Sequence, residues 1–106
     1  MSRYKEIWVD GPNGESLCAL INGDVGWLIY LRYECDAGFS SRNPDYARDA
    51  SAEIDYVLMN GQQDWYPASW ALPLSRLNQA LDYFRSTGRM SPFVTWHNDY
   101  NDEAVP

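Results

Sequence analysis

Three side chains of this 106-residue chain could support nucleophilic or metal chemistry: the single histidine, His97, and the two cysteines, Cys18 and Cys35. A cysteine thiolate paired with an imidazole base is a common catalytic nucleophile. No nucleophile motif surrounds either cysteine, and Cys18 lies in an apolar run, where a small buried residue is the ordinary explanation. We therefore predict no catalytic residue, and a small enzyme that uses His97 with a cysteine is kept as an alternative.

Metal and cofactor sites are not predicted either. A structural zinc site needs about four Cys or His ligands, and the chain offers only three such residues, at unsuitable spacing. The segment from Asp45 to Asp49 lacks the alternating oxygen ligands and the central glycine of a calcium loop. No phosphate-binding motif follows Gly11 and Gly14. The sequence therefore indicates no metal and no cofactor.

The charge balance limits the kinds of partner. The chain carries 15 acidic and 8 basic side chains, which gives a formal net charge of −7 and a pI near 4.4. Proteins that bind nucleic acid without help use clusters of Lys and Arg to contact the phosphates. We therefore expect no direct contact with nucleic acid. Two interpretations stay open: the charge serves solubility, or it attracts a basic protein partner.

Negative charge is concentrated in the middle of the chain. Residues 34–64 contain seven acidic side chains against two basic ones, Arg42 and Arg48. An aromatic segment, residues 65–70, follows, and Trp and Tyr are favoured anchors at protein interfaces, although packing under a helix is their more common role. A solvated, charged loop is the alternative to a binding surface. The candidate contact residues are Glu34, Asp36, Arg42, Asp45, Asp49, Asp64, Trp65 and Tyr66.

The elements that must position these residues are predicted from apolar patterns and turn signals. β-prone runs predict strands, turn formers predict an irregular loop over residues 34–52, and Asn60-Gly61 predicts a hairpin turn. Apolar residues at helical spacing predict a helix that opens with Leu72-Pro73 and ends at Gly88. A last strand ends at Trp96. The other strands are expected at residues 4–9, 15–21, 27–33, 53–59 and 62–66.

These elements predict an α+β domain: a mostly antiparallel sheet of about five or six strands, with one main C-terminal helix packed on one face, followed by a final strand. The opposite face or the loops would remain for a partner. We expect a single domain over residues 1–97 and an acidic, disordered tail over residues 98–106. Without an apolar run long enough for a membrane span or a signal peptide, a cytoplasmic location is expected. The oligomeric state stays open.

The region from about Gly38 to Trp96 resembles the first family of polymorphic-toxin immunity proteins, whose members accompany toxins that include nucleic-acid deaminases. The order and spacing of several short motifs carry the resemblance. They are Phe39-Ser40-Ser41-Arg42-Asn43-Pro44, Tyr56-Val57-Leu58-Met59-Asn60-Gly61-Gln62, Pro67, Leu72-Pro73, Ala80-Leu81, Phe84, Gly88, Pro92, Val94 and Trp96.

The resemblance implies an immunity protein that binds and neutralises a cognate bacterial toxin, with a nucleic-acid deaminase as the favoured partner. A toxin that acts on nucleic acid needs a basic cleft, so the acidic segment would occlude that active site and steer association. Such inhibition requires no catalytic residue. A generic protein-binding adaptor or regulatory domain is the alternative from a different functional class.

Overall fold

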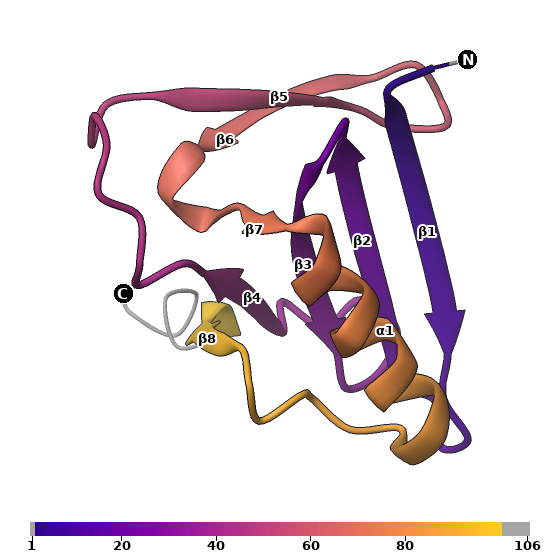
Figure 1. Ribbon diagram of the computed structural model, residues 1–106. Coiled ribbons are helices and arrows are strands. Elements are labelled where there is room, and N and C mark those ends of the chain that lie inside the picture. Colours follow the sequence, from indigo (N-terminus) through magenta and orange to yellow (C-terminus); the bar gives the residue numbers. More distant parts are fainter. Residues whose placement is uncertain (1, 101–106) are drawn as a thin grey trace.

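The computed structural model describes residues 2–100 as an α+β fold, with an antiparallel sheet and one α-helix on one of its faces (Figure 1). The predicted fold class is confirmed. The main sheet has the order β1-β2-β3-β4-β8, with the short strand β7 paired to β3, and β5 and β6 form a separate hairpin. The elements are β1 (Tyr4–Asp10), β2 (Ser16–Asn22), β3 (Val25–Leu31), β4 (Phe39–Arg42), β5 (Glu53–Val57), β6 (Gln63–Pro67), a 3-10 turn η1 (Ala68–Trp70), β7 (Leu72–Pro73), α1 (Leu74–Thr87) and β8 (Thr95–Asn98).

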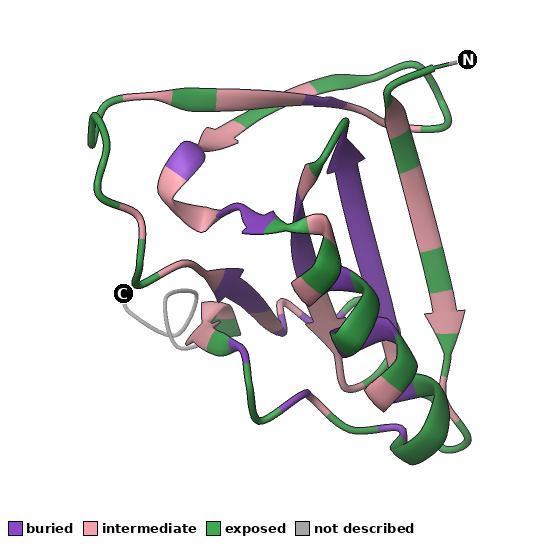
Figure 2. Cartoon of the chain, in the orientation of Figure 1, coloured by how far each residue is buried: buried purple, intermediate pink, exposed green. Residues whose placement is uncertain are grey.

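Strands β1, β2 and β3, which correspond to the three strands predicted before residue 34, form an antiparallel meander. The turn that begins at Gly11 closes with a hydrogen bond from the Gly11 amide to the Glu15 carbonyl at 2.7 Å, and the next turn follows Asn22. Strand β2 lies between the other two, and almost all of its residues are buried on both faces of the sheet (Figure 2). This double burial explains why β2 reads as a continuous apolar run instead of an alternating one.

Helix α1 covers one face of the sheet. Its buried side consists of Leu77, Ala80, Leu81 and Phe84, which are the positions that the helical spacing predicted. The helix ends at Gly88, which is left-handed with φ +70° and donates its amide to the Phe84 carbonyl at 2.7 Å. These side chains pack on one face of β2. The core on this face contains Leu17, Ala19, Ile21, Leu28, Leu72, Leu77, Ala80, Leu81, Phe84 and Val94.

The predicted start of the helix is wrong by two residues. Leu72 and Pro73 are extended and pair with Gly26 and Val25 of β3, so that the helix begins at Leu74. A residue before proline is disfavoured in the helical region, which keeps Leu72 in the strand. Pro73 occupies the cap position with ψ 150°, and the Leu74 amide donates to the Asp24 carbonyl at 2.9 Å.

The opposite face of the sheet is covered by the β5–β6 hairpin, which crosses it as a second layer (Figure 1). Tyr56 is 1% exposed there, and Tyr66 packs on Trp27 with the two rings tilted and their centroids 4.2 Å apart. The core on this face joins Cys18 and Leu20 to these rings. Of the two surfaces that we expected to remain for a partner, the hairpin therefore occupies part of the opposite face, and the loops remain.

Strand β4 lies inside the segment that we predicted as an irregular loop. Its two serines, Ser40 and Ser41, are at most 1% exposed, and β4 pairs with both β3 and β8. The Ser41 hydroxyl accepts the Leu28 amide at 3.0 Å and donates to the Trp70 carbonyl at 3.3 Å. Buried serines with backbone partners carry no apolar pattern, which is why the strand was missed.

The final strand β8 ends one residue after position 97, where we expected the domain to end. Asn98 is its last residue, and the amides of Asp99 and Tyr100 both donate to the Gly38 carbonyl, at 3.0 and 3.3 Å. The rest of the predicted tail, residues 101–106, lies outside the described residues. Within residues 2–100, no helix has the length and apolar content needed to cross a bilayer.

Candidate functional site

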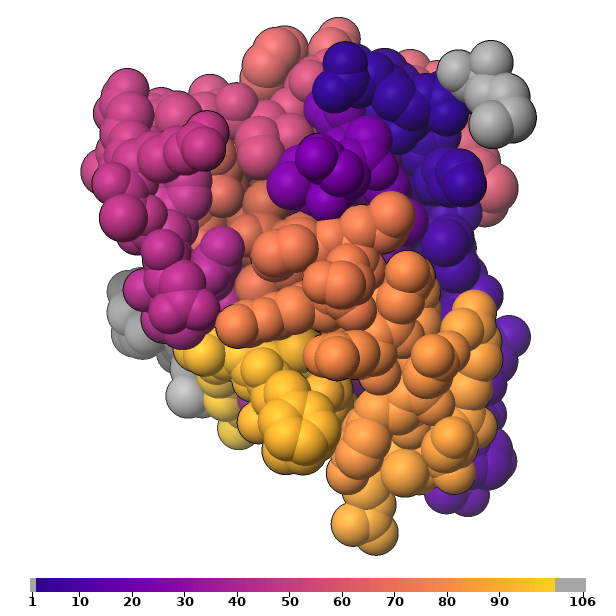
Figure 3. Space-filling view, in the orientation of Figure 1, coloured from indigo at the N-terminus to yellow at the C-terminus, as the bar shows by residue number. Residues whose placement is uncertain are grey.

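A groove with a volume of about 770 Å³ opens between the loop after β4 and the segment that runs from η1 into α1. Four carboxylates line it, with one arginine, Arg48. In Figure 3 the magenta surface of the loop bulges beside the orange surface of α1. We call this hollow the acidic groove. Its charged lining residues are Asp24, Asp45, Arg48, Asp49 and Glu53.

The loop that carries Asp45 and Asp49 is held at both ends. Asn43 donates its amide to the Ser69 carbonyl at 2.9 Å and its side chain to the Ala71 carbonyl at 3.0 Å, while its Oδ1 accepts the Asp45 amide. At the other end, the Ala68 amide donates to the Ala52 carbonyl at 2.8 Å. A loop fixed in this way presents its side chains with little further loss of entropy on binding.

The two predicted aspartates of the loop point to solvent. Asp49 accepts the Ser51 hydroxyl at 2.7 Å and the Ser51 amide at 2.9 Å, and these bonds lower the pKa of the Asp49 carboxyl. It is therefore fully ionised at neutral pH. Asp45 contacts Arg76 of α1 at 3.4 Å, but its side chain remains 73% exposed. Such an exposed pair contributes little to stability, so the Asp45 carboxylate is available to a partner.

Asp36 does not belong to this surface. Its side chain is 2% exposed, and its carboxylate accepts three hydrogen bonds from Arg32: from Nε at 2.7 Å, from Nη2 at 2.8 Å and from the backbone amide at 3.0 Å. The bonds from the Arg32 guanidinium hold the pKa of the Asp36 carboxyl well below its usual range. Asp36 thus fixes the turn between β3 and β4. Glu34 is exposed on the same turn, outside the acidic groove.

Arg42 is likewise committed to the fold. Its guanidinium lies over the Trp70 ring, 3.8 Å from the centroid, and donates to the Ser41 carbonyl at 2.9 Å. It also approaches Asp99 to 3.7 Å, and its side chain is only 21% exposed. Arg42 therefore joins β4 to η1 and to the residue that follows β8, and it does not line the acidic groove.

The hairpin separates the two aromatic residues that we predicted as anchors. Trp65 points outward from β6 and is 56% exposed, opposite Asp55 of β5. Tyr66 points inward and packs on Trp27. Asp64 accepts the Tyr66 hydroxyl at 3.3 Å and is only half-buried. Of the pair, only Trp65 can meet a partner without a change in the core.

The acidic groove also contains a residue that sequence reasoning did not select. Asp24 stands in the turn between β2 and β3, and β7 brings it beside the loop through the pairing of Pro73 with Val25. Asp24 lies outside the acidic segment of residues 34–64, so the charge pattern did not indicate it. Glu53 was counted in the acidic segment but was not chosen. The structure thus brings together Asp45 and Asp49, adds Asp24 and Glu53, and leaves the other predicted residues outside the groove.

Comparison with protein-family models matches residues 4–98 to the family described as immunity protein Imm1. This chain belongs to the Imm1 family. The match runs from the first residue of β1 to the last residue of β8, so it covers the sheet, the hairpin and the helix together. The resemblance to a family of immunity proteins is confirmed. Neither the search of curated proteins nor that of solved structures finds a match.

A catalytic pair of Cys18 with His97 receives no support from the geometry of this Imm1 chain. Cys18, Ile29, Ser40 and His97 are direct neighbours across β2, β3, β4 and β8. Three strand spacings of about 4.8 Å therefore separate Cys18 from His97, or roughly 14 Å. Burial raises the pKa of the Cys18 thiol to about 12, so the thiol is protonated at neutral pH. Among residues 2–100, no group of three potential ligands is placed to bind a metal ion.

Thiol titration provides a direct check of this burial. We expect a thiol reagent at pH 8 to modify one cysteine of the folded Imm1 chain, because Cys35 is exposed and Cys18 is 1% exposed. In denaturant both thiols should react, since the Cys18 pKa then returns to about 8.5. Cys35→Ser serves as the control and should abolish the reaction of the folded protein. Rapid modification of two thiols without denaturant would contradict the packing of β2 against the hairpin.

Proposed function

We propose that this chain neutralises a cognate bacterial toxin, a nucleic-acid deaminase, by occluding its active site with the acidic groove. The observation that carries the proposal is the groove itself, a preformed hollow lined by four carboxylates, two of them on a fixed loop, in a member of an immunity family. An enzyme that acts on nucleic acid needs a basic surface for the phosphates. The net negative charge of the groove is complementary to such a surface.

The contact has two parts in this proposal. The carboxylates of the acidic groove steer the toxin and pair with its basic substrate-binding residues, which speeds association and excludes nucleic acid. Trp65 provides an aromatic anchor at the rim, because it faces outward on the hairpin strand next to β5, where Glu53 lines the groove. The protein acts in the cytoplasm, where the toxin meets its nucleic-acid substrate. No residue of the chain acts as a catalyst.

Co-expression tests the proposal. The toxin domain encoded next to this chain is produced in bacteria with and without it, and growth is recorded. We expect growth to be restored, and we expect the purified chain to inhibit deamination of an oligonucleotide in competition with that substrate. If growth were not restored and no complex of the chain with the toxin domain formed, the proposed immunity role would be wrong. A toxin that cleaves nucleic acid instead would overturn only the deaminase assignment.

The same assay separates this proposal from the enzyme alternative. His97→Ala should leave neutralisation unchanged, because His97 lies on β8 and does not line the acidic groove. An inhibitor that acts by occlusion must be present in at least equal amount to the toxin, whereas an enzyme acts below that ratio. The enzyme would be favoured if the wild-type chain protected at a small fraction of the toxin concentration and His97→Ala abolished that protection.

A further inference from the structure

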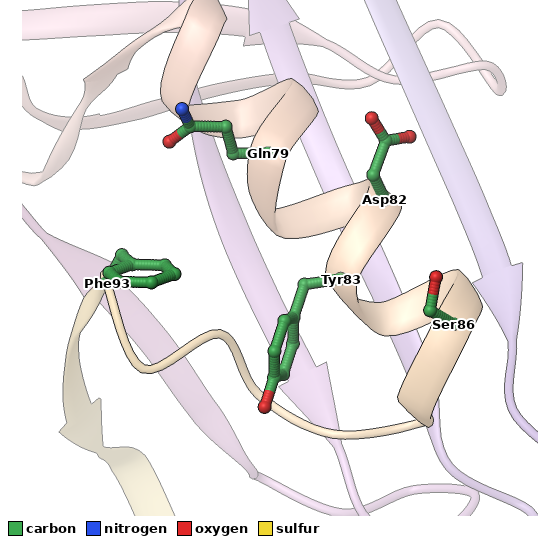
Figure 4. Close-up of a pocket in the computed structure, with 5 residues that line it drawn as sticks. All are labelled: Gln79, Asp82, Tyr83, Ser86 and Phe93. Carbon is green, nitrogen blue, oxygen red and sulfur yellow. The ribbon is translucent and has the colours of Figure 1, made fainter.

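A second hollow lies on the other side of α1. It has a volume of about 490 Å³ and is lined by Gln79, Asp82, Tyr83, Ser86 and Phe93. Figure 4 shows Gln79 and Tyr83 on the side of the helix that faces Phe93. Phe93 is 75% exposed, although it is among the most apolar residues of the chain. We call this hollow the apolar groove, since two aromatic rings flank it and none of its lining residues is basic.

The two grooves are joined by the exposed face of α1. Arg76 contacts Asp45 at the rim of the acidic groove, and Gln79, three residues later, lines the apolar groove. Residues three apart on a helix are neighbours on one face. In Figure 3 the orange surface of α1 borders both the magenta loop and the yellow segment that follows the helix. A partner seated in the acidic groove is therefore in reach of Phe93.

The size of a typical stable interface favours such an extension. Specific protein complexes bury about 800 Å² on each partner, and exposed charge pairs of the kind found in the acidic groove mainly set association rates. Most of the binding energy of an interface comes from a few buried side chains, with aromatic residues prominent among them. Phe93 is a large exposed ring in a preformed hollow beside the acidic groove, and covering it would remove a large apolar area from water.

We propose that the apolar groove is the second half of the toxin-binding surface, in which an apolar side chain of the toxin packs on Phe93 while the basic residues of the toxin occupy the acidic groove. This inference rests on the proposed function. It assigns different tasks to the two hollows: the acidic groove governs how fast the complex forms, and the apolar groove governs how long it lasts.

Phe93→Ala tests the inference, with Met59→Ala as its matched control. Phe93 and Met59 are 75% and 76% exposed, but Met59 lies in the β5–β6 turn, outside both grooves. We expect Phe93→Ala to raise the Kd for the purified toxin domain about tenfold, through faster dissociation, with no change in association rate or in salt dependence. Met59→Ala should change the Kd less than about twofold.

A second variant places bulk and charge in the groove without removing a contact of the fold. Gln79 is exposed, and lysine is as good a helix former as glutamine. Gln79→Lys should therefore keep the thermal stability of the chain and weaken toxin binding to a similar extent as Phe93→Ala. Equal Kd values for wild type, Phe93→Ala and Gln79→Lys would overturn the inference and leave the proposed function intact. A wild-type chain that forms no complex would instead overturn the proposed function.

Discussion

Replacing Asp45 and Asp49 together by lysine is expected to slow association with the toxin at least about tenfold at low salt. The charged lining of the acidic groove consists of four carboxylates and one arginine, a net charge of −3, and the two reversals make it +1. Both side chains are exposed and make no contact with the core, so the fold should be retained. Stopped-flow mixing at low and high salt measures the effect.

The reversal also predicts the salt dependence. Wild-type association should fall as ionic strength rises, because salt screens the attraction between exposed charges. The double variant should lose most of that dependence. Reversal of Asp10 and Glu34 is the matched control, since it changes the net charge of the chain equally at exposed positions outside the groove. If both double variants associated equally slowly, overall charge and not the groove would be responsible.

Gly38→Ala is expected to have the largest effect on stability, a loss of about 3 kcal/mol or more in the free energy of unfolding. Gly38 has φ +73°, and a Cβ atom there would lie 2.1 Å from the Tyr30 carbonyl oxygen. That oxygen belongs to the backbone of β3, so the overlap is relieved only if the β3–β4 turn shifts. The shift would disturb the amides of Asp99 and Tyr100, which donate to the Gly38 carbonyl.

Gly61→Ala separates the two reasons why Gly38→Ala should lose stability, which are the left-handed backbone and the overlap of the new Cβ atom with Tyr30. Gly61 has φ +89° in the β5–β6 turn, but a Cβ atom there would meet nothing within 4 Å. Its cost should therefore be the left-handed backbone alone, about 1 to 2 kcal/mol. Urea denaturation of both variants gives the two free energies. Equal losses would show that backbone conformation, and not the contact with Tyr30, makes Gly38 necessary.

The parts of the fold that local chemistry determines could be predicted from the sequence. The apolar spacing of Leu77, Ala80, Leu81 and Phe84 identified the helix, and Gly88 identified its end. Strand β4 could not be found in this way, because Ser40 and Ser41 are buried through hydrogen bonds and not through apolar side chains. The pairing of β7 with β3 depends on residues distant in sequence, and it placed the start of the helix later than predicted.

The sequence predicted that the candidate site is acidic, but it did not predict which acidic residues come together. The charge run indicated Asp45 and Asp49, which do line the groove, but it also included Asp36, whose carboxylate is buried against Arg32. A charged residue four positions from an opposite charge reads the same in sequence whether the pair is exposed or buried. Asp24 and Phe93 were missed because each gains its position from tertiary packing, where segments distant in sequence meet.

The division of the molecule by its central sheet has a consequence for how such a protein can change its specificity. Strand β2 takes part in both cores, but the helix-side core contains none of the acidic residues of the groove. Substitutions of exposed side chains in the loop and on the outer side of the hairpin therefore remove no apolar contact from the helix-side core, and we expect their effects on stability to add to those of core substitutions. An immunity protein built in this way can follow a diversifying toxin by exchanging loop residues, while its helix and sheet preserve the margin of stability that each exchange consumes.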